Sequence, residues 1–485
     1  MVQLKKMNEK KLFIILVITS IFILSIPLVI RTVFFDSYPL GYESYSSIAR
    51  ASQFFGGEEF IGMDVLFSQK SSVPDLYEFV LGIFSFFVDT RIIAVLLPYV
   101  LGIFSSILFY LILRSFPIKK ESRFVTAIFF ILSPAFFYTF STSQGISLAF
   151  FLNLAGFFFL MKKKRIFFFI SLLIYLVLPF TGVFNFLIAL CSLFYLYLFK
   201  SRNKKILSII IVSVSVAFLF YIPLLSLLGF PFLRIAFTRG IFSYFISDLG
   251  AKSGFGAFMV FLCAIGLYLS WKKKREYYFM YIFLFGLVIL SLFNESLLVY
   301  LCIPVSFFSG IAFIELFNMK WDLPRIKDFS IIIIICGTLF SISSYSSYLI
   351  RDGPSLEEIE SLEWLRIHFN NQDGAILSHP SNGFLIEAIT GKPVVIDDDK
   401  GYFYENSQDI NNSFSLFHSR NLDKSKSLLG MYNITHIWIN EKMKSDIWGG
   451  KEDGLLFLFR NNETFKKIYN YTSIDIWKLT TNKPK

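Results

Sequence analysis

The chain has 485 residues, of which 55% are hydrophobic and 62 are phenylalanine. This composition, with a mean hydropathy of +0.61, excludes a soluble protein of this length and predicts a polytopic α-helical membrane protein. The net charge of +11 does not predict nucleic-acid binding, because the basic residues lie in short runs between apolar segments and not on one surface.

The first predicted element is a retained helix behind a Lys-rich N-terminus, because its apolar part is long and no small-residue cleavage site follows it. A membrane-spanning helix needs roughly 20 mostly apolar residues, or somewhat fewer where the bilayer thins. The sequence contains eleven such segments, at about 12–30, 92–113, 123–140, 146–161, 166–179, 182–199, 206–229, 255–270, 277–292, 296–316 and 328–346. We therefore expect about eleven transmembrane helices.

The basic loops predict the orientation of these helices. If the N-terminus is cytoplasmic, every later basic run, such as "KKKR" at 162–165 and again at 272–275, also faces the cytoplasm, and the alternate loops are poor in Lys and Arg. A further apolar segment at 75–89 would reverse all later basic loops if it crossed the membrane. We therefore interpret it as an interfacial or re-entrant helix with Asp75, Glu78 and Asp89 near the water.

The odd number of spans places the first loop, 31–91, and the polar tail on the same outer face. The sequence thus predicts a transmembrane domain over 1–346 and a small extracytoplasmic α/β domain over 347–485. Within the tail, helical spacing predicts a helix over 354–371, and short β-rich runs predict strands. These runs are 375–380, 393–397, 434–440 and 473–479. Four glycosylation triplets in the tail, beginning at Asn411, Asn433, Asn462 and Asn470, agree with an outward-facing domain.

Carboxylates gather in the first outer loop, close to the predicted membrane surface. Asp36 lies six residues past the first apolar segment and Glu43 seven residues further on, and Glu58, Glu59 and Asp64 follow. A long first outer loop with an acid near its start, interfacial helices, about ten more spans and an outer α/β tail together resemble the GT-C glycosyltransferases. These membrane enzymes take a sugar from a polyprenyl-phosphate carrier.

In that family an Asp just after the first span is the usual catalytic acidic residue, and Asp36 in "FFDSYPLGYESY" occupies that position. The resemblance implies an inverting transfer from a polyprenyl- or dolichyl-phosphate-linked donor to a glycan, lipid or protein. Asp36 would act as the general base, with Glu43 as its nearest acidic companion. Cations stabilise the charge that grows on the leaving phosphate, and the planar guanidinium of Arg bonds two oxygens at once. Arg50, Arg234 and Arg239 are the candidates.

The tail most resembles the outer domain of oligosaccharyltransferase catalytic subunits, but it departs from their Trp-Trp-Asp-Tyr-Gly signature. The matching place reads "ILSHPSNGFLIEAITGKPVVIDDD", in which 379–381 is His-Pro-Ser. His379 and Asn382 are minor candidates for acceptor binding. The second outer loop, "TFSTSQGIS" at 139–147, also lacks the acidic pair that helps those enzymes hold a divalent metal. No cofactor is predicted, and a tightly held metal is not favoured.

The sequence therefore favours a monosaccharide transferase that relies on Asp36 over an enzyme that glycosylates proteins. Two alternatives stay open: oligosaccharyltransferase-like protein glycosylation, and a non-enzymatic flippase or transporter of lipid-linked glycans. A transporter is expected to carry polar residues near the bilayer midplane and internal repeats. Short linkers, Lys and Asn richness and the absence of a disulfide framework indicate a prokaryotic plasma membrane, with an archaeal source included in the expectation.

Overall fold

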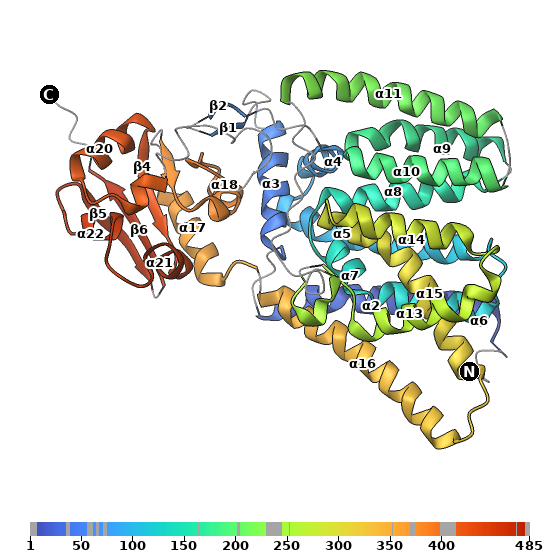
Figure 1. Cartoon of the computed structure of the whole chain (residues 1–485). Helices are drawn as coiled ribbons and strands as arrows, with labels where there is room; N and C mark the ends of the chain where they lie inside the picture. Colours follow the sequence, from blue (N-terminus) through green and yellow to red (C-terminus); the bar gives the residue numbers. More distant parts are fainter. Residues whose placement is uncertain are drawn as a thin grey trace. The chain divides into compact units, whose positions relative to one another are not determined.

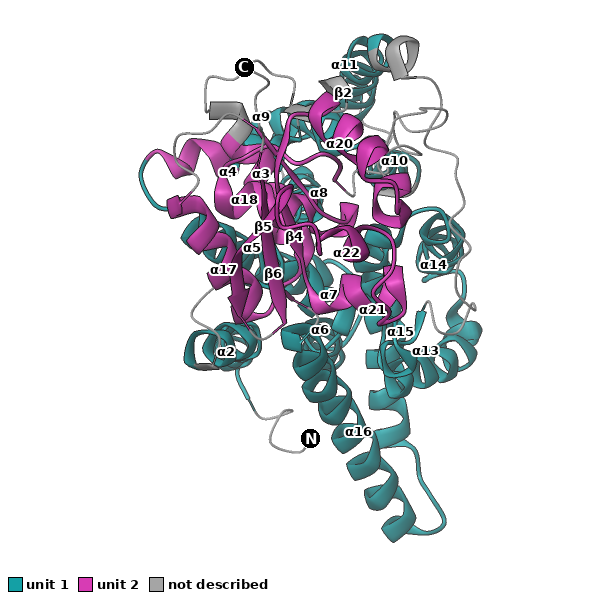
Figure 2. Cartoon of the chain, turned by 90° about the vertical axis from the view of Figure 1, so that its left-hand side faces the viewer, with its two compact units in different colours: residues 1–40, 75–80, 87–352 teal, residues 41–74, 81–86, 353–485 magenta. Residues whose placement is uncertain are grey.

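The structure is a computed structural model of the chain. It describes residues 7–34, 39–55, 62–64, 67–70, 75–162, 164–200, 204–228, 245–251, 253–351, 353–368, 374–397, 414–471 and 473–480. The described part is mostly helical (Figure 1). Two compact units are distinguished in Figure 2: unit 1 comprises 1–40, 75–80 and 87–352, and unit 2 comprises 41–74, 81–86 and 353–485.

Unit 1 is built from helices that match the predicted apolar segments one by one. They are α2 Glu9–Phe34, α5 Thr90–Leu113, α6 Lys120–Ile131, α7 Pro134–Ser141, α8 Gly145–Leu160, α9 Arg165–Val177, α10 Val183–Tyr195, α11 Lys204–Leu228, α13 Ala257–Ser270, α14 Tyr278–Ser291, α15 Leu298–Asn318 and α16 Pro324–Arg351. One predicted span, 123–140, is covered by the two helices α6 and α7, which are bent by 56°. Pro134 begins α7, where its missing N–H and fixed φ suit a new helix start.

Not every one of these helices is long enough to cross a membrane alone. In the described residues, five helical stretches have the length and apolarity of a span, or six if α6 and α7 form one bent span. Others, such as α8, α9, α10 and α14, are apolar but shorter. The total of about eleven spans therefore stays a prediction. Helix α4, Leu76–Ser85, has 10 residues and is about 15 Å long, too short to be a twelfth span.

Helix α15 lies at the centre of unit 1, with 83% of its apolar window buried. Small residues let its neighbours come close. A Cβ added to Gly266 of α13 would lie 2.1 Å from the Phe308 carbonyl oxygen of α15, and one added to Gly310 of α15 would lie 2.2 Å from Thr126 Oγ1 of α6. Close backbone approach through glycine is a common way to pack helices where lipid supplies no hydrophobic driving force.

Unit 2 contains a four-stranded sheet with the order β3-β4-β6-β5. Its strands are β3 Ala375–Leu377, β4 Ile434–Ile439, β5 Phe465–Tyr471 and β6 Ile474–Leu479. β3 and β4 are parallel, and the other two pairs are antiparallel. The predicted run at 393–397 contributes a single bridge, from Val394 to Ile376, and β5 was not anticipated. The fully buried Trp438 of β4 donates its Nε1–H to Ser361 Oγ at 2.9 Å, which ties the sheet to a helix.

The helices of unit 2 come from the tail and from the first loop. They are α3 Tyr42–Phe55, α17 Leu356–His368, α18 Gly383–Thr390, α20 Leu422–Met431, α21 Glu441–Trp448 and α22 Leu455–Leu458. The loop also supplies an antiparallel strand pair, β1 Gly62–Asp64 and β2 Phe67–Lys70. The helix predicted over 354–371 is thus α17, and α3 packs against α18. Residues of the first loop and of the tail therefore share one compact unit.

Candidate active site

Several predicted site residues lie outside the part of the chain that the structure describes. They are Asp36, Glu58, Glu59, Arg234 and Arg239. Asp64 belongs to β1, but its side chain is not described. The structure does describe both flanks of Asp36, together with Glu43, Arg50, His379 and Asn382. The flanks of Asp36 belong to unit 1, and Glu43, Arg50, His379 and Asn382 belong to unit 2, so the two sets are described separately.

The N-terminal flank of Asp36 is held by a buried arginine. Arg31 lies in the last turn of α2 and is 2% exposed. Its Nη1 donates to the carbonyl oxygen of Ile350, near the end of α16, at 3.4 Å. A cation beside the carbonyls of a helix C-terminus is electrostatically favourable. This contact joins the end of the first predicted span to the end of the last one.

The C-terminal flank of Asp36 pairs with the second predicted outer loop. Leu40 forms a parallel β-bridge with Thr142, which lies between α7 and α8. In the same loop, the Ser143 hydroxyl forms a hydrogen bond with the Tyr77 hydroxyl of α4 at 2.7 Å. Leu40, Ser143 and Thr142 are all buried. The start of the first loop, the second loop and the short helix α4 thus meet within unit 1.

A carboxylate also reaches this second loop, although its own sequence has none. The Asp75 side chain accepts the Tyr77 backbone N–H at 3.0 Å. A Cβ added to Gly145 would lie 2.1 Å from Asp75 Oδ2, so the carboxylate packs against the first residue of α8. A negative charge is stabilised by the N-terminus of a helix. Burial, with a smaller contribution from the Asp75 charge, raises the pKa of Tyr77, and its phenol therefore stays protonated.

The sequence predicts only that Asp75 lies near the water, as part of the interfacial segment 75–89. Nothing in the local pattern indicates that it packs against Gly145, 70 positions later in the sequence. The glycine is the only signal, because a side chain at Gly145 would displace the carboxylate.

Glu43 and Arg50 lie on α3 in unit 2. Glu43 is in the first turn of the helix and is half-buried. Arg50 follows seven residues later, two turns along and on the same face, and its guanidinium carbon is 5.2 Å from the centre of the Phe384 ring of α18. This cation–π contact places a predicted phosphate-binding arginine against a helix of the tail.

His379 and Asn382 follow the carboxyl end of β3. The His379 ring Nδ1 accepts the Ser381 N–H at 3.3 Å, and Asn382 Nδ2 donates to Ser378 Oγ at 3.3 Å. His379 is half-exposed, whereas Asn382 is buried. In parallel α/β arrangements the carboxyl ends of strands are where ligands usually bind. The position suits an acceptor site, but both side chains also make local structural hydrogen bonds.

Asp397 lies near the same edge of the sheet, because the segment containing Val394 pairs in parallel with β3. Asp397 is 3% exposed, and a Cβ on Gly383 would lie 2.6 Å from its Cα. Glycine is therefore required at the start of α18. Among the described residues, no group of three or more His, Cys, Asp and Glu side chains is arranged to hold a metal ion.

Glu358 of α17 connects the first-loop helix to the tail, and the sequence did not single it out. It accepts from the Tyr42 hydroxyl of α3 at 3.3 Å and from Asn440 Nδ2 at the end of β4 at 2.7 Å. It also accepts the Ser355 N–H, while Ser355 Oγ accepts the Glu358 N–H, which is a capping box. One carboxylate thus holds three elements of unit 2 together.

No family model and no curated protein matches the chain. Solved structures do match it. The oligosaccharyltransferase of Archaeoglobus fulgidus aligns with a TM-score of 0.60, covering 97% of this chain and 75% of that one at 11% identity. The mycobacterial arabinofuranosyltransferase AftD gives a TM-score of 0.62, covering 98% of this chain and 40% of that one at 13% identity.

ArnT of Cupriavidus metallidurans, in a structure bound to undecaprenyl phosphate, gives a TM-score of 0.52. The match covers 97% of this chain and 98% of that one at 10% identity. All three are GT-C glycosyltransferases. The chain is a membrane protein with the GT-C fold, and the resemblance expected from its sequence is confirmed at the level of the fold.

Proposed function

We propose that this chain is a membrane glycosyltransferase that moves a sugar from a polyprenyl-phosphate-linked donor to a glycan, lipid or protein acceptor. The observation that carries the proposal is the fold, shared over almost the whole chain with enzymes of this class. Among these relatives, one structure holds undecaprenyl phosphate and another holds dolichol-phosphate. The reaction would take place on the outer face of a prokaryotic plasma membrane.

Asp36 is the proposed general base. It takes the proton of the acceptor hydroxyl while that oxygen bonds to the anomeric carbon, and the bond from that carbon to the carrier phosphate breaks with inversion. The electron pair leaves with the phosphate. The contacts of the neighbouring residues support this proposal. Arg31, five positions earlier, donates to the Ile350 carbonyl, and Leu40, four positions later, forms a β-bridge with Thr142.

Arg50, Arg234 and Arg239 are proposed to bind the donor phosphate, because guanidinium groups stabilise the charge that develops on it. Glu43 is the proposed acidic companion of Asp36. His379 and Asn382 are proposed for the acceptor, which their place at the carboxyl end of β3 supports.

Protein glycosylation is the second candidate function, and the match to the Archaeoglobus fulgidus oligosaccharyltransferase favours it. The residues at 379–381, His-Pro-Ser, favour a different acceptor. A peptide that contains an Asn-X-Thr triplet, offered beside glycan and lipid acceptors, separates these outcomes by which one becomes labelled.

The direct test is turnover by Asp36→Asn, measured with purified protein, radiolabelled polyprenyl-phosphate sugars and a membrane extract as the acceptor source. Loss of a general base is expected to lower the rate by about 10²–10⁴-fold, with donor binding retained. Asp89→Asn is the matched control, because Asp89 caps α5 through the Arg91 N–H and Asn caps equally well. Full turnover by Asp36→Asn would reject the assignment, and absence of any transfer by the unmodified protein would favour a flippase or transporter.

A further inference from the structure

Helices α8, α9, α10 and α11 pack on one another within unit 1 (Figure 1). The sequence from 122 to 247, which contains all four helices, has no Asp or Glu. Two basic runs lie in this stretch: "KKKR" at 162–165 joins α8 to α9, and "KSRNKK" at 200–205 joins α10 to α11. The cations of these runs therefore have no acidic neighbour in their own helices and loops.

The two basic runs come together at one end of the four helices. Lys205 Nζ of α11 lies 5.8 Å from the centre of the Phe168 ring of α9, and α9 begins at Arg165, three positions before Phe168. The exposed cations of this basic end are Lys162, Lys164, Arg165, Lys204 and Lys205. The first four form no ion pair with any residue that the structure describes. Their positive charge is therefore not balanced by the described chain.

The basic end adjoins apolar surface on the same helix. Lys162 Nζ is 4.6 Å from the centre of the Phe158 ring, and the Arg165 guanidinium carbon is 5.8 Å from the centre of the Phe169 ring. Phe169 is 52% exposed and Ile166 is 63% exposed. Exposed cations beside exposed apolar side chains match a phospholipid, in which the anionic phosphate adjoins the acyl chains. A soluble polyanion would contact the cations alone.

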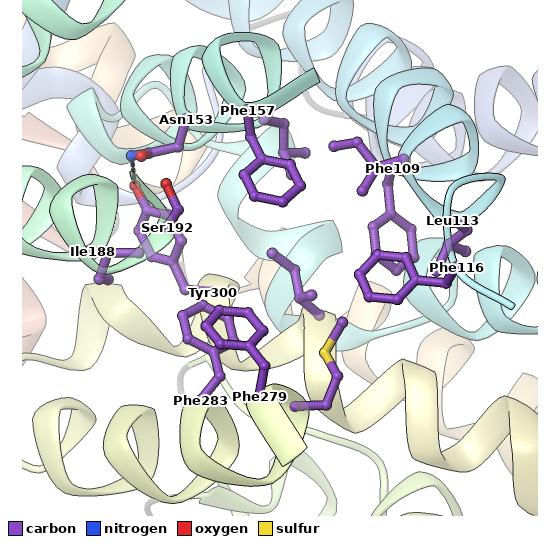
Figure 3. A pocket seen from close by; sticks show the side chains of 14 residues that line it. Phe109, Leu113, Phe116, Asn153, Phe157, Ile188, Ser192, Phe279, Phe283 and Tyr300 are labelled. Carbon is purple, nitrogen blue, oxygen red and sulfur yellow. Dashed lines mark hydrogen bonds between the residues drawn. The ribbon is translucent and has the colours of Figure 1, made fainter. Parts of the chain in front are cut away.

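The interior beside these helices offers the cations no partner. A cavity of about 70 Å³ lies between α5, α8, α10, α14 and α15. Its lining is almost entirely apolar and includes Phe109, Phe116 and Phe157 (Figure 3). None of the fourteen residues drawn around it is charged. Counterions for the basic end therefore come from outside the helices.

Other basic segments on the same predicted side of the membrane have acids beside them. Glu9 accepts from Arg114 at 2.9 Å and from Arg123 at 3.0 Å. The second "KKKR" run, 272–275, is followed directly by Glu276. The same four residues thus occur twice in the chain, in two different electrostatic surroundings.

We propose that the basic end binds the headgroups of anionic phospholipids in the leaflet that it faces, which the predicted topology makes the inner leaflet. Clusters of roughly four to eight Lys or Arg beside a membrane helix attract anionic lipid, and each cation near the surface raises the affinity about fivefold. The lipid phosphates balance the charge that the four helices leave uncompensated. This binding is independent of sugar transfer.

The test uses the purified full chain in detergent at low salt, with an equal mixture of phosphatidylglycerol and phosphatidylcholine. Native mass spectrometry counts the lipids that the protein retains, and the unmodified chain should retain phosphatidylglycerol in preference. The triple variant Lys162→Gln, Arg165→Gln, Lys204→Gln should weaken the affinity for phosphatidylglycerol about 100-fold. Its binding of phosphatidylcholine should not change. Melting temperature and elution volume show whether the variant is folded.

The triple variant Lys272→Gln, Lys274→Gln, Arg275→Gln is the matched control. It removes two Lys and one Arg from the run beside Glu276, and its affinity for phosphatidylglycerol should change by less than about fivefold. Equal losses in the two triple variants would show that lipid binding follows net charge and would overturn the assignment of a site. No preference for phosphatidylglycerol by the unmodified chain, or its displacement by soluble polyphosphate, would overturn the lipid assignment.

Discussion

At the scale of single residues, His436 shows how a polar side chain in the tail can serve the fold instead of catalysis. It lies on β4, is 3% exposed, and pairs across the sheet with Lys478. Burial, with a contribution from the Lys478 charge, lowers the pKa of His436 from 6.5 to about 4. The sequence offered no metal ligand or catalytic partner for this histidine, and its burial agrees with a structural role.

A pH dependence of stability follows from His436. Between pH 6.5 and 4 the unfolded chain binds a proton that the folded chain does not, so the free energy of unfolding falls as the pH falls through this window. The loss is on the order of 3 kcal/mol when complete. Denaturant unfolding followed by tryptophan emission at pH 7 and pH 4.5 should show it, and His436→Phe should show a smaller decrease. Equal decreases in both proteins would contradict this account.

At the scale of elements, two pairs of helices in unit 1 pack closely because a glycine lies at each contact. Gly266 of α13 lies against α15, and Gly310 of α15 lies against α6. The chain also has a glycine in α14, Gly286, around which an added Cβ would meet nothing within 4 Å. A methyl group added by alanine would therefore meet backbone atoms at Gly266 of α13 but open space at Gly286 of α14.

Gly266→Ala is expected to destabilise the protein, because its methyl group would meet the rigid backbone of α15, 2.1 Å from the Phe308 oxygen. Overpacking of this kind costs about 1–3 kcal/mol. Gly286→Ala should leave the stability unchanged or raise it, since alanine has a higher helix propensity than glycine. Thermal unfolding of the two variants in detergent compares them directly. A similar melting temperature for both would show that the crossing of α13 and α15 relaxes freely.

At the scale of the whole molecule, the proposed chemistry depends on which side of the membrane receives the first loop. The basic runs predict that residue 36 faces outward and that 272–275 faces the cytoplasm. This orientation follows from the distribution of Lys and Arg, and it is independent of the fold.

Accessibility labelling tests the orientation. Asp36→Cys, in a chain whose four cysteines have been replaced, should react with a membrane-impermeant maleimide in intact cells. Lys273→Cys should react only after the membrane is opened. Reaction of Lys273→Cys alone in intact cells would reverse the topology and end the proposal that Asp36 acts at the outer surface.

The sequence by itself determined the helical membrane class, the position of nearly every helix of unit 1, and the GT-C resemblance. Apolar runs and their breaks are local properties, and the helices that they predict differ from the observed ones by only a few residues at most ends. The strands β3, β4 and β6 were also predictable from their β-rich runs, whereas β5, with its exposed lysines, was not.

Only the tertiary structure decided which distant residues meet. It brought Asp75 to Gly145, Leu40 to Thr142 and the first-loop helix α3 to the tail. No periodicity of the sequence encodes these pairs, because each contact depends on several helices or strands packing together at once. Composition specifies how strongly each segment avoids water, but the contacts between segments are selected by the packing of the whole chain.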